Sequence, residues 1–215
     1  MHFTAERRVL TKKDPTLRSL FARTDFSQFT IRESQLYPAL VRAIAHQMVH
    51  GNAAKACLRR LMERTGNTRS KALVPSAAVV AQVTQAELRQ CGFSENKSRA
   101  IFELTQKVIK GEIPTTRKLK AMSDADIVRT LVPLRGIGQW TVEMYLIFSL
   151  GRSDVFPVDD FGVREGYRIW KGEKKQRTPR YLRIKARQWS PYSTLVARAL
   201  WQESDRAKVK KHDRK

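Results

Sequence analysis

Cysteine and long apolar runs are both scarce in this chain of 215 residues. Its two cysteines, Cys57 and Cys91, are too few for a disulfide framework, a four-cysteine zinc site or a four-cysteine iron–sulfur cluster. We expect them to be reduced thiols of an intracellular protein. No apolar stretch approaches the ~20 residues that span a bilayer, and no apolar run follows the first charges, so neither a membrane span nor a secretory signal is expected.

Acidic residues are also scarce relative to basic ones. Asp and Glu together number 20 against 42 for Lys and Arg, which gives a formal net charge of +22. Such a surface repels itself unless a polyanion is the partner, and nucleic acid is the polyanion that this excess favours. A merely basic or ribosome-like protein is the alternative. The excess is steepest over 206–215, where we expect either a basic arm over phosphates or an ordinary solvated terminus.

Helical spacing and helix caps recur along the chain, whereas the alternation typical of strands is rare. The pattern predicts an all-α protein of roughly ten short helices, long enough to bury a core without disulfides. Helices are predicted over 36–44, 53–64, 94–110, 123–131, 141–150 and 191–204, with shorter ones starting near Asp14, Pro75, Thr84, Asp160 and Pro179. The helix over 141–150 is apolar nearly all round, which predicts that it is buried.

A tight hairpin is predicted between two helices at residues 134–141. Gly136 and Gly138 flank the apolar Ile137, and glycine permits unusual backbone angles and close approach. Main-chain N–H groups of the turn and the N-terminus of the following helix can face an anion such as a DNA phosphate. Such a contact holds the DNA strand without reading its sequence. A plain connection within a helix bundle is the alternative.

Two adjacent aspartates open a later helix. Asp159 and Asp160 follow Pro157, and one carboxylate can cap the helix while the other is free to point into a cleft. Two acids at a helix start, without any catalytic role, are the alternative.

The hairpin, the buried helix and the run Pro-Val-Asp-Asp-Phe-Gly-Val-Arg at 157–164 together resemble the helix–hairpin–helix DNA glycosylase superfamily. Within it the chain looks like the AlkA-type 3-methyladenine DNA glycosylase II family in a compact form. Residues 40–54 are similar to the segment that probes for lesions, and 189–193 with Trp201 are similar to the last helix. The resemblance covers about Tyr37 to Trp201. It implies two helical lobes with the active site in the cleft between them, in a glycosylase domain over 1–205 followed by the basic tail 206–215.

The resemblance implies a hydrolase that flips alkylated purines of the 3-methyladenine and 7-methylguanine type out of duplex DNA and cuts their N-glycosidic bonds, which initiates base excision repair. Asp160 maps onto the catalytic carboxylate, which would stabilise positive charge at C1′ of the sugar. Asp159 would be mainly a structural cap. Trp140 stands where strand-cleaving relatives carry a lysine, so no amine is present for a Schiff base and a monofunctional enzyme is implied.

The resemblance also implies a pocket for the extruded base. An aromatic face attracts a cationic methylated purine by about 0.5–2 kcal/mol. The tryptophans could instead pack in the core at a helix junction. The implied pocket residues are Trp140, Met144, Phe161 and Trp201.

A side chain from the turn at 47–50 would fill the space that the base leaves. Met48 is the candidate wedge, with Gln47 and His50 contacting base edges or the backbone. Many close relatives have a second glutamine in place of Met48, and Met48 could instead pack in the core. The hairpin residues implied to grip a phosphate are Arg135, Gly136, Ile137 and Gly138.

No metal or cofactor is implied, although a monovalent cation at the hairpin, as in relatives, is left open. The expected partner is double-stranded DNA with alkylated bases. The protein is expected to be monomeric, away from membranes, in the cytoplasm or nucleoid of a bacterium or the nucleus of a eukaryote. Two alternatives remain: a glycosylase for ethenoadenine or deaminated purines, and a non-catalytic helix–hairpin–helix DNA-binding protein.

Overall fold

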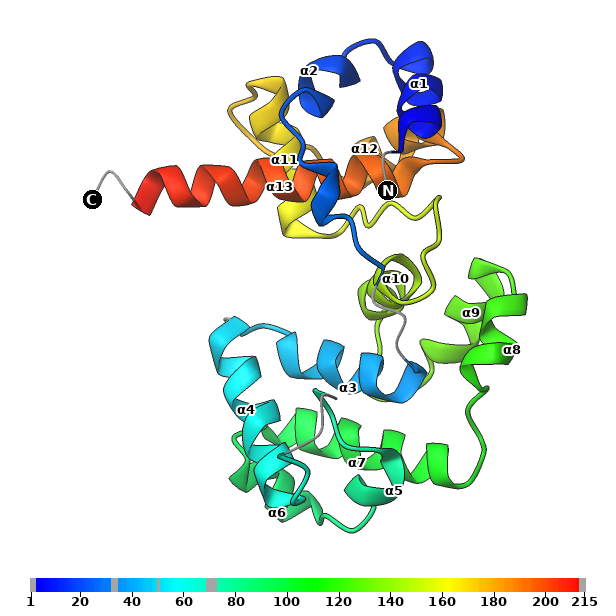
Figure 1. Ribbon diagram of the computed structural model, residues 1–215, viewed down its shortest axis with the longest axis vertical. Helices are drawn as coiled ribbons and strands as arrows, with labels where there is room; N and C mark the ends of the chain where they lie inside the picture. The colour runs from blue at the N-terminus through cyan, green and yellow to red at the C-terminus, as the bar shows by residue number, and fades with distance from the viewer. Residues whose placement is uncertain (1–2, 32–34, 50, 69–72, 213–215) are drawn as a thin grey trace. The chain divides into compact units, whose positions relative to one another are not determined.

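A computed structural model describes residues 3–31, 35–49, 51–68 and 73–212, of which 210–212 are described by their backbone alone. Within these ranges the regular structure consists of thirteen α-helices and two short 3₁₀ helices, without a strand (Figure 1). The predicted all-α class is therefore confirmed. None of the helices in this part of the chain combines the length and apolar character needed to cross a membrane.

The chain divides into two compact units. The terminal unit comprises residues 1–31 and 151–215, and the central unit comprises 32–150. The terminal unit contains α1 (Thr4–Lys13), α2 (Leu17–Phe21), η1 (Phe26–Gln28), α11 (Phe161–Lys171), α12 (Pro179–Ala186), η2 (Arg187–Trp189) and α13 (Ser193–His212). The central unit contains α3 (Leu36–His46), α4 (Gly51–Arg64), α5 (Ala77–Val80), α6 (Gln85–Gln90), α7 (Glu95–Ile109), α8 (Thr116–Ala121), α9 (Asp124–Leu131) and α10 (Gln139–Phe148).

The central unit is built around α3, which packs against α4, α7 and α10. Its apolar stripe supplies Leu40 and Ile44, both fully buried, and α7 and α10 supply the buried Ile101 and Val142. Burial of each such side chain stabilises the fold by about 1.5–3 kcal/mol. This core holds the ends of α3 and α10 in place relative to one another.

Two glycines set the close approach of α11 and α13 in the terminal unit. A Cβ atom on Gly166 would lie 1.9 Å from the main-chain oxygen of Leu200, and one on Gly162 would lie 2.8 Å from Cδ1 of Trp201. Any larger residue at these two positions would therefore force the helices apart. The contact aligns α13 along α11 and brings Trp201 to the first turn of α11.

Asp14 ties the N-terminal helices to the C-terminal part of the terminal unit. This buried carboxylate accepts hydrogen bonds from the side chains of Thr16 (2.6 Å), Gln188 (2.9 Å) and Trp189 (3.1 Å). Burial by itself would raise the pKa of Asp14, but the hydrogen bonds from Thr16 and Trp189, together with Lys185, outweigh it and hold the pKa below its ordinary value. The helix predicted to start near Asp14 is α2, and its N-cap residue is Thr16.

Most predicted helix starts are confirmed because their capping residues act as expected. Ser76, Ser94 and Ser123 each accept a hydrogen bond from the main-chain N–H three residues later, and Thr84 forms a capping box with Glu87.

Some boundaries differ from the predictions. The last helix runs to His212 rather than ending near Ser204, because no glycine or proline interrupts it and Lys208 pairs with Asp205 one turn earlier (2.8 Å). Helices α4 and α10 each begin two residues before the predicted start, at Gly51 and Gln139. Helices α1 and α8 were not predicted. The first is largely polar with one buried residue, Leu10, so its apolar face gives little periodic signal.

Candidate functional site

Asp160 both caps α11 and binds an aromatic side chain. Its Oδ1 accepts a hydrogen bond from the main-chain N–H of Val163 (2.8 Å) and another from the indole Nε1 of Trp201 (2.7 Å). Two donors on one oxygen fix the rotation of the carboxylate. The expectation that Asp159 is the cap is wrong, because Asp159 is exposed and its Oδ2 lies 4.0 Å from the Arg183 guanidinium.

The approach of Trp201 to Asp160 depends on residues that the sequence interpretation did not single out. Gly162 leaves room for the indole, because a Cβ there would lie 3.2 Å from both Trp201 Nε1 and Asp160 Oδ1. Gly166, one turn later, lets α13 approach as described above. A signal was present, since a glycine inside a helix costs about 1 kcal/mol relative to alanine. Two of them spaced by four residues indicate a close helix crossing.

Two of the predicted pocket residues, Trp201 and Phe161, lie in the terminal unit and have different environments. Trp201 is half-buried and packs against the core cluster of its unit, while its Nε1 bonds to Asp160. It therefore combines part of the alternative core role with direct contact to the candidate catalytic carboxylate. Phe161, the next residue after Asp160, is 65% exposed, which leaves most of its ring available to a ligand.

The predicted hairpin lies in the central unit, between α9 and α10. Gly136 has φ +74°, and a Cβ there would also lie 2.7 Å from the Cβ of Ala100, so both backbone and packing require glycine. Gly138 is the N-cap residue of α10, and a Cβ on it would meet nothing within 4 Å. Ile137 is buried and its N–H donates to the carbonyl of Leu134 (3.0 Å), so its side chain anchors the turn.

Arg135 stands on the exposed side of this hairpin. Its guanidinium pairs with Glu103 of α7 at 3.0 Å, and both side chains are more than two-fifths exposed. Exposed pairs of this kind are worth little, so a phosphate can compete for the arginine at small cost.

The segment at the C-terminus of α3 is bonded to the hairpin. The side-chain amide of Gln47 donates from Nε2 to the carbonyl of Gly136 (2.8 Å) and to Oγ1 of Thr141 (3.1 Å). Lys97 donates to the carbonyl of Ala45 (2.9 Å), which satisfies one of the last main-chain oxygens of α3. Of the predicted probing residues, Gln47 is therefore engaged within the protein.

Met48 projects fully into solvent from this turn. Its side chain is 101% exposed, and its backbone is left-handed with φ +53°, an unusual conformation for a residue other than glycine. The alternative that Met48 packs in the core is wrong. His50 lies outside the described residues.

His46 precedes these two residues at the end of α3. Burial lowers its pKa, and the nearby charges of Lys55, Lys97 and Arg42 lower it further. The turn therefore begins next to an imidazole that stays uncharged at neutral pH.

Trp140 and Met144 lie one helical turn apart on α10, and both are half-buried. Neither is fully enclosed in the core. No group of three or more His, Cys, Asp or Glu side chains able to hold a metal occurs among the described residues. Both cysteines are free thiols, as expected, with Cys91 buried.

Comparison with known proteins assigns these features to a class. Residues 41–191 match the HhH-GPD superfamily of base excision DNA repair proteins, and because the match covers most of the chain, the chain belongs to this superfamily. The family resemblance found in the sequence is confirmed.

Individual relatives are similar over most of their length. The chain is 33% identical to DNA-3-methyladenine glycosylase 1 of Schizosaccharomyces pombe over 175 residues, which are 81% of this chain and 75% of that protein. The structure of the S. pombe 3-methyladenine DNA glycosylase in complex with abasic DNA has a TM-score of 0.80 and 30% identity, covering 93% of this chain and 96% of that one. The DNA-3-methyladenine glycosidase of Bacillus halodurans has a TM-score of 0.78 and 25% identity, covering 93% and 88% of the two chains.

Proposed function

We propose that this protein is a monofunctional DNA glycosylase that hydrolyses the N-glycosidic bond of alkylated purines in duplex DNA and leaves an abasic site. Membership of the superfamily and the similarity to 3-methyladenine glycosylases support this function. The observation that carries it is the fixed carboxylate of Asp160, held by Val163 and Trp201.

The chemistry needs a negative charge near a developing positive one. As the bond between C1′ and the base nitrogen breaks, its electron pair leaves with the purine, and C1′ becomes oxocarbenium-like. A methylated purine carries a formal positive charge, so it departs neutral. Water then adds to C1′ and loses a proton. Asp160 stabilises the charge at C1′ and orients the attacking water or accepts its proton.

Rigidity of the carboxylate is part of the proposal. A preorganised charge stabilises a transition state without reorganising at the moment of reaction. The two hydrogen bonds on Oδ1 of Asp160 supply that rigidity, and the close contact of α11 with α13 supplies the hydrogen bond from Trp201.

The damaged base is recognised by aromatic faces and by the sulfur of Met144. In the terminal unit the side chains proposed for this contact are Phe161 and Trp201, and in the central unit they are Trp140 and Met144. The exposed ring of Phe161 and the half-buried state of the other three support this role. A cationic purine gains about 0.5–2 kcal/mol on such a face, which favours alkylated over normal bases.

The central unit holds the DNA and keeps the base extruded. Met48 enters the space vacated by the base, which its complete exposure supports. The turn at Gly136 and Gly138 faces a phosphate, with Arg135 beside it. Gln47 positions the wedge through its hydrogen bonds to Gly136 and Thr141.

Trp140 stands at the position where strand-cleaving relatives carry a lysine. No amine is therefore available there to form a Schiff base, so the enzyme does not cleave the strand.

The direct test is base release by the full chain from duplexes that each carry one defined lesion. We expect release of 3-methyladenine and 7-methylguanine, revealed by alkali cleavage of the abasic product. Faster release of ethenoadenine or hypoxanthine would assign the enzyme to a different lesion. Tight, salt-sensitive binding without release of any base would make it a non-catalytic DNA-binding protein.

Sedimentation of the same sample should show a monomer. In the cell the enzyme acts in the compartment that holds the genome.

A further inference from the structure

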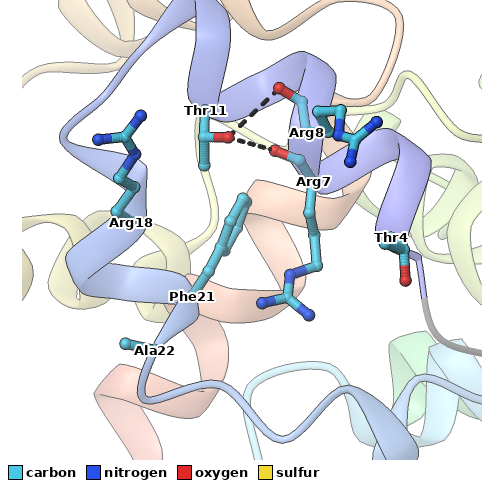
Figure 2. A pocket seen from close by; sticks show the side chains of 7 residues that line it. All are labelled: Thr4, Arg7, Arg8, Thr11, Arg18, Phe21 and Ala22. Atoms are coloured by element: carbon cyan, nitrogen blue, oxygen red, sulfur yellow. Dashed lines mark hydrogen bonds between the residues drawn. The ribbon is translucent and has the colours of Figure 1, made fainter.

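A hollow of about 430 Å³ opens on the terminal unit, with walls from α1 and α2 (Figure 2). None of its lining residues is acidic, and three carry permanently charged guanidinium groups. The lining residues are Thr4, Arg7, Arg8, Thr11, Arg18, Phe21 and Ala22.

Neighbouring aromatic residues support this hollow. The guanidinium carbon of Arg7 lies 4.5 Å from the centre of the Phe26 ring. Phe21, which is almost fully buried, meets Phe26 edge-on with ring centres 5.6 Å apart. The hydroxyl of Thr11 donates to the carbonyl of Arg7 (2.8 Å), and Figure 2 shows the Phe21 side chain between those of Arg7 and Arg18. Arg7 and Phe21 are therefore held in place before any ligand arrives.

The positive charge of the hollow is not balanced from within the described part of the chain. There, Arg7, Arg8 and Arg18 form no ion pair with a carboxylate. Elsewhere in the same unit arginines do pair, as Arg168 does with Glu165 at 2.7 Å. Like charges gathered around one hollow repel one another, and an anionic ligand would relieve that repulsion.

The chemistry of the lining indicates the kind of anion. Guanidinium groups present forked donors that match the oxygens of a phosphate, and charge-assisted hydrogen bonds of this type are about twice as strong as neutral ones. The hollow is larger than one phosphate group and lies within the ~300–1,000 Å³ of small-ligand sites. A phosphate with part of a nucleoside attached fits both properties.

From these observations we infer that the hollow formed by Arg7, Arg8 and Arg18 binds a nucleotide phosphate, and that the DNA strand supplies it. This inference rests on the proposed function. It gives the terminal unit a phosphate contact of its own, separate from that of the hairpin in the central unit. The same chemistry would also accept a free nucleotide, so the test separates the two sources.

The test compares two double variants of the full chain. Arg8→Gln/Arg18→Gln removes two exposed charges from the hollow and leaves Arg7 on Phe26. Lys12→Gln/Arg187→Gln removes two exposed charges from the same unit but outside the hollow. Binding to undamaged duplex DNA is measured from low to high salt. The slope of log affinity against log salt should become shallower by about 0.9 for each DNA phosphate that the variant no longer neutralises.

We expect the slope to become shallower by about one unit in the hollow variant and to stay near the wild-type value in the control. A second arm titrates deoxyadenosine monophosphate into both proteins. Binding of this nucleotide to the wild type but not to the hollow variant, with an unchanged DNA slope, would keep the phosphate site and assign it to a free ligand. Equal slopes in all three proteins together with no nucleotide binding, or an equal fall in both variants, would overturn the inference. Thermal melting checks that both variants fold.

Because the DNA carries no lesion, the outcome does not depend on catalysis. Absence of the slope change would leave base release by Asp160 unaffected. Failure of base release would leave a measured phosphate contact in place. The two proposals can therefore fail separately.

Discussion

The indole Nε1 of Trp201 donates a hydrogen bond of 2.7 Å to Oδ1 of Asp160, the oxygen that also caps α11. One carboxylate thus has a structural partner on its own helix and an aromatic partner on α13. The helix cap, which the sequence interpretation assigned to Asp159, is therefore Asp160, the same residue that we propose as the catalytic carboxylate. Positioning of this carboxylate is consequently sensitive to changes in Trp201.

Trp201→Phe should separate the hydrogen bond from the aromatic surface. The ring face remains for the base, but the donor to Asp160 is removed, so the carboxylate gains rotational freedom. We expect kcat for release of 3-methyladenine to fall by roughly 10-fold with little change in KM, because an interaction that matters in the transition state is removed.

Trp170→Phe provides the matched control, since Trp170 also lies in the terminal unit and donates from Nε1 to Ser19 Oγ (3.0 Å). That variant should lose some thermal stability and keep its kcat. An unchanged kcat in Trp201→Phe would show that the Trp201–Asp160 bond has no part in catalysis.

The two hairpin glycines should behave differently on substitution. Gly138→Ala places a methyl group in open space at an ordinary backbone angle, so the fold should keep its melting temperature while phosphate approach is blocked. Affinity for damaged and undamaged duplexes should fall equally, by several-fold, because a phosphate contact carries no sequence information.

Gly136→Ala is the destabilising counterpart. Its methyl group would lie 2.7 Å from Ala100 Cβ at a left-handed backbone position, which should cost about 1–3 kcal/mol of unfolding free energy. Urea unfolding distinguishes the two variants. Normal DNA affinity in Gly138→Ala would remove the phosphate role from the hairpin.

Met48→Ala should slow base release without weakening the fold. Because the side chain is fully exposed, its truncation removes no packing, and the unfolding free energy should change by less than about 0.5 kcal/mol. Loss of the wedge should lower the population of extruded base, measured as fluorescence of 2-aminopurine placed beside the lesion. Ile109→Ala, which truncates another exposed apolar residue of the central unit, should leave the rate of base release and the 2-aminopurine fluorescence unchanged. Equal fluorescence in Met48→Ala and wild type would refute the wedge role.

His46 predicts a pH dependence of stability. Its pKa in the folded protein lies below the ordinary value near 6.5 because of burial and nearby cations. As the pH falls below about 6.5, the unfolded chain therefore binds a proton that the folded protein does not, and the unfolding free energy decreases.

His46→Asn removes this titration. In urea unfolding at pH 8.0 and pH 5.5, the wild type should lose more stability between the two pH values than the variant does. Equal losses would show that His46 does not titrate differently in the folded and unfolded states.

Local signals explain why much of the fold could be predicted. Caps such as Ser94 and Thr84 act through main-chain groups three residues away, so their effect is contained in a short segment of sequence. Glycine after a helix, as at Gly111 with φ +70°, ends the helix equally locally. These local features predict the positions of most helices to within a few residues of those in the structure.

Features that depend on distant parts of the chain could not be predicted in this way. The bond between Trp201 and Asp160 joins residues 41 positions apart, and that between Gln47 and Gly136 spans 89. Both require the tertiary packing of whole helices. The choice of Asp160 over Asp159 as the cap likewise depends on where α11 begins, which two adjacent acids leave undetermined.

Single-turnover base release by Asp160→Asn tests the central claim most directly. Asparagine keeps an oxygen that can accept from Val163 and Trp201, so helix capping, melting temperature and duplex binding should be preserved. Without the negative charge at C1′, release of 3-methyladenine should slow by about 100-fold or more. A variant that folds, binds DNA and releases the base at the wild-type rate would contradict the assignment of Asp160 as the catalytic residue.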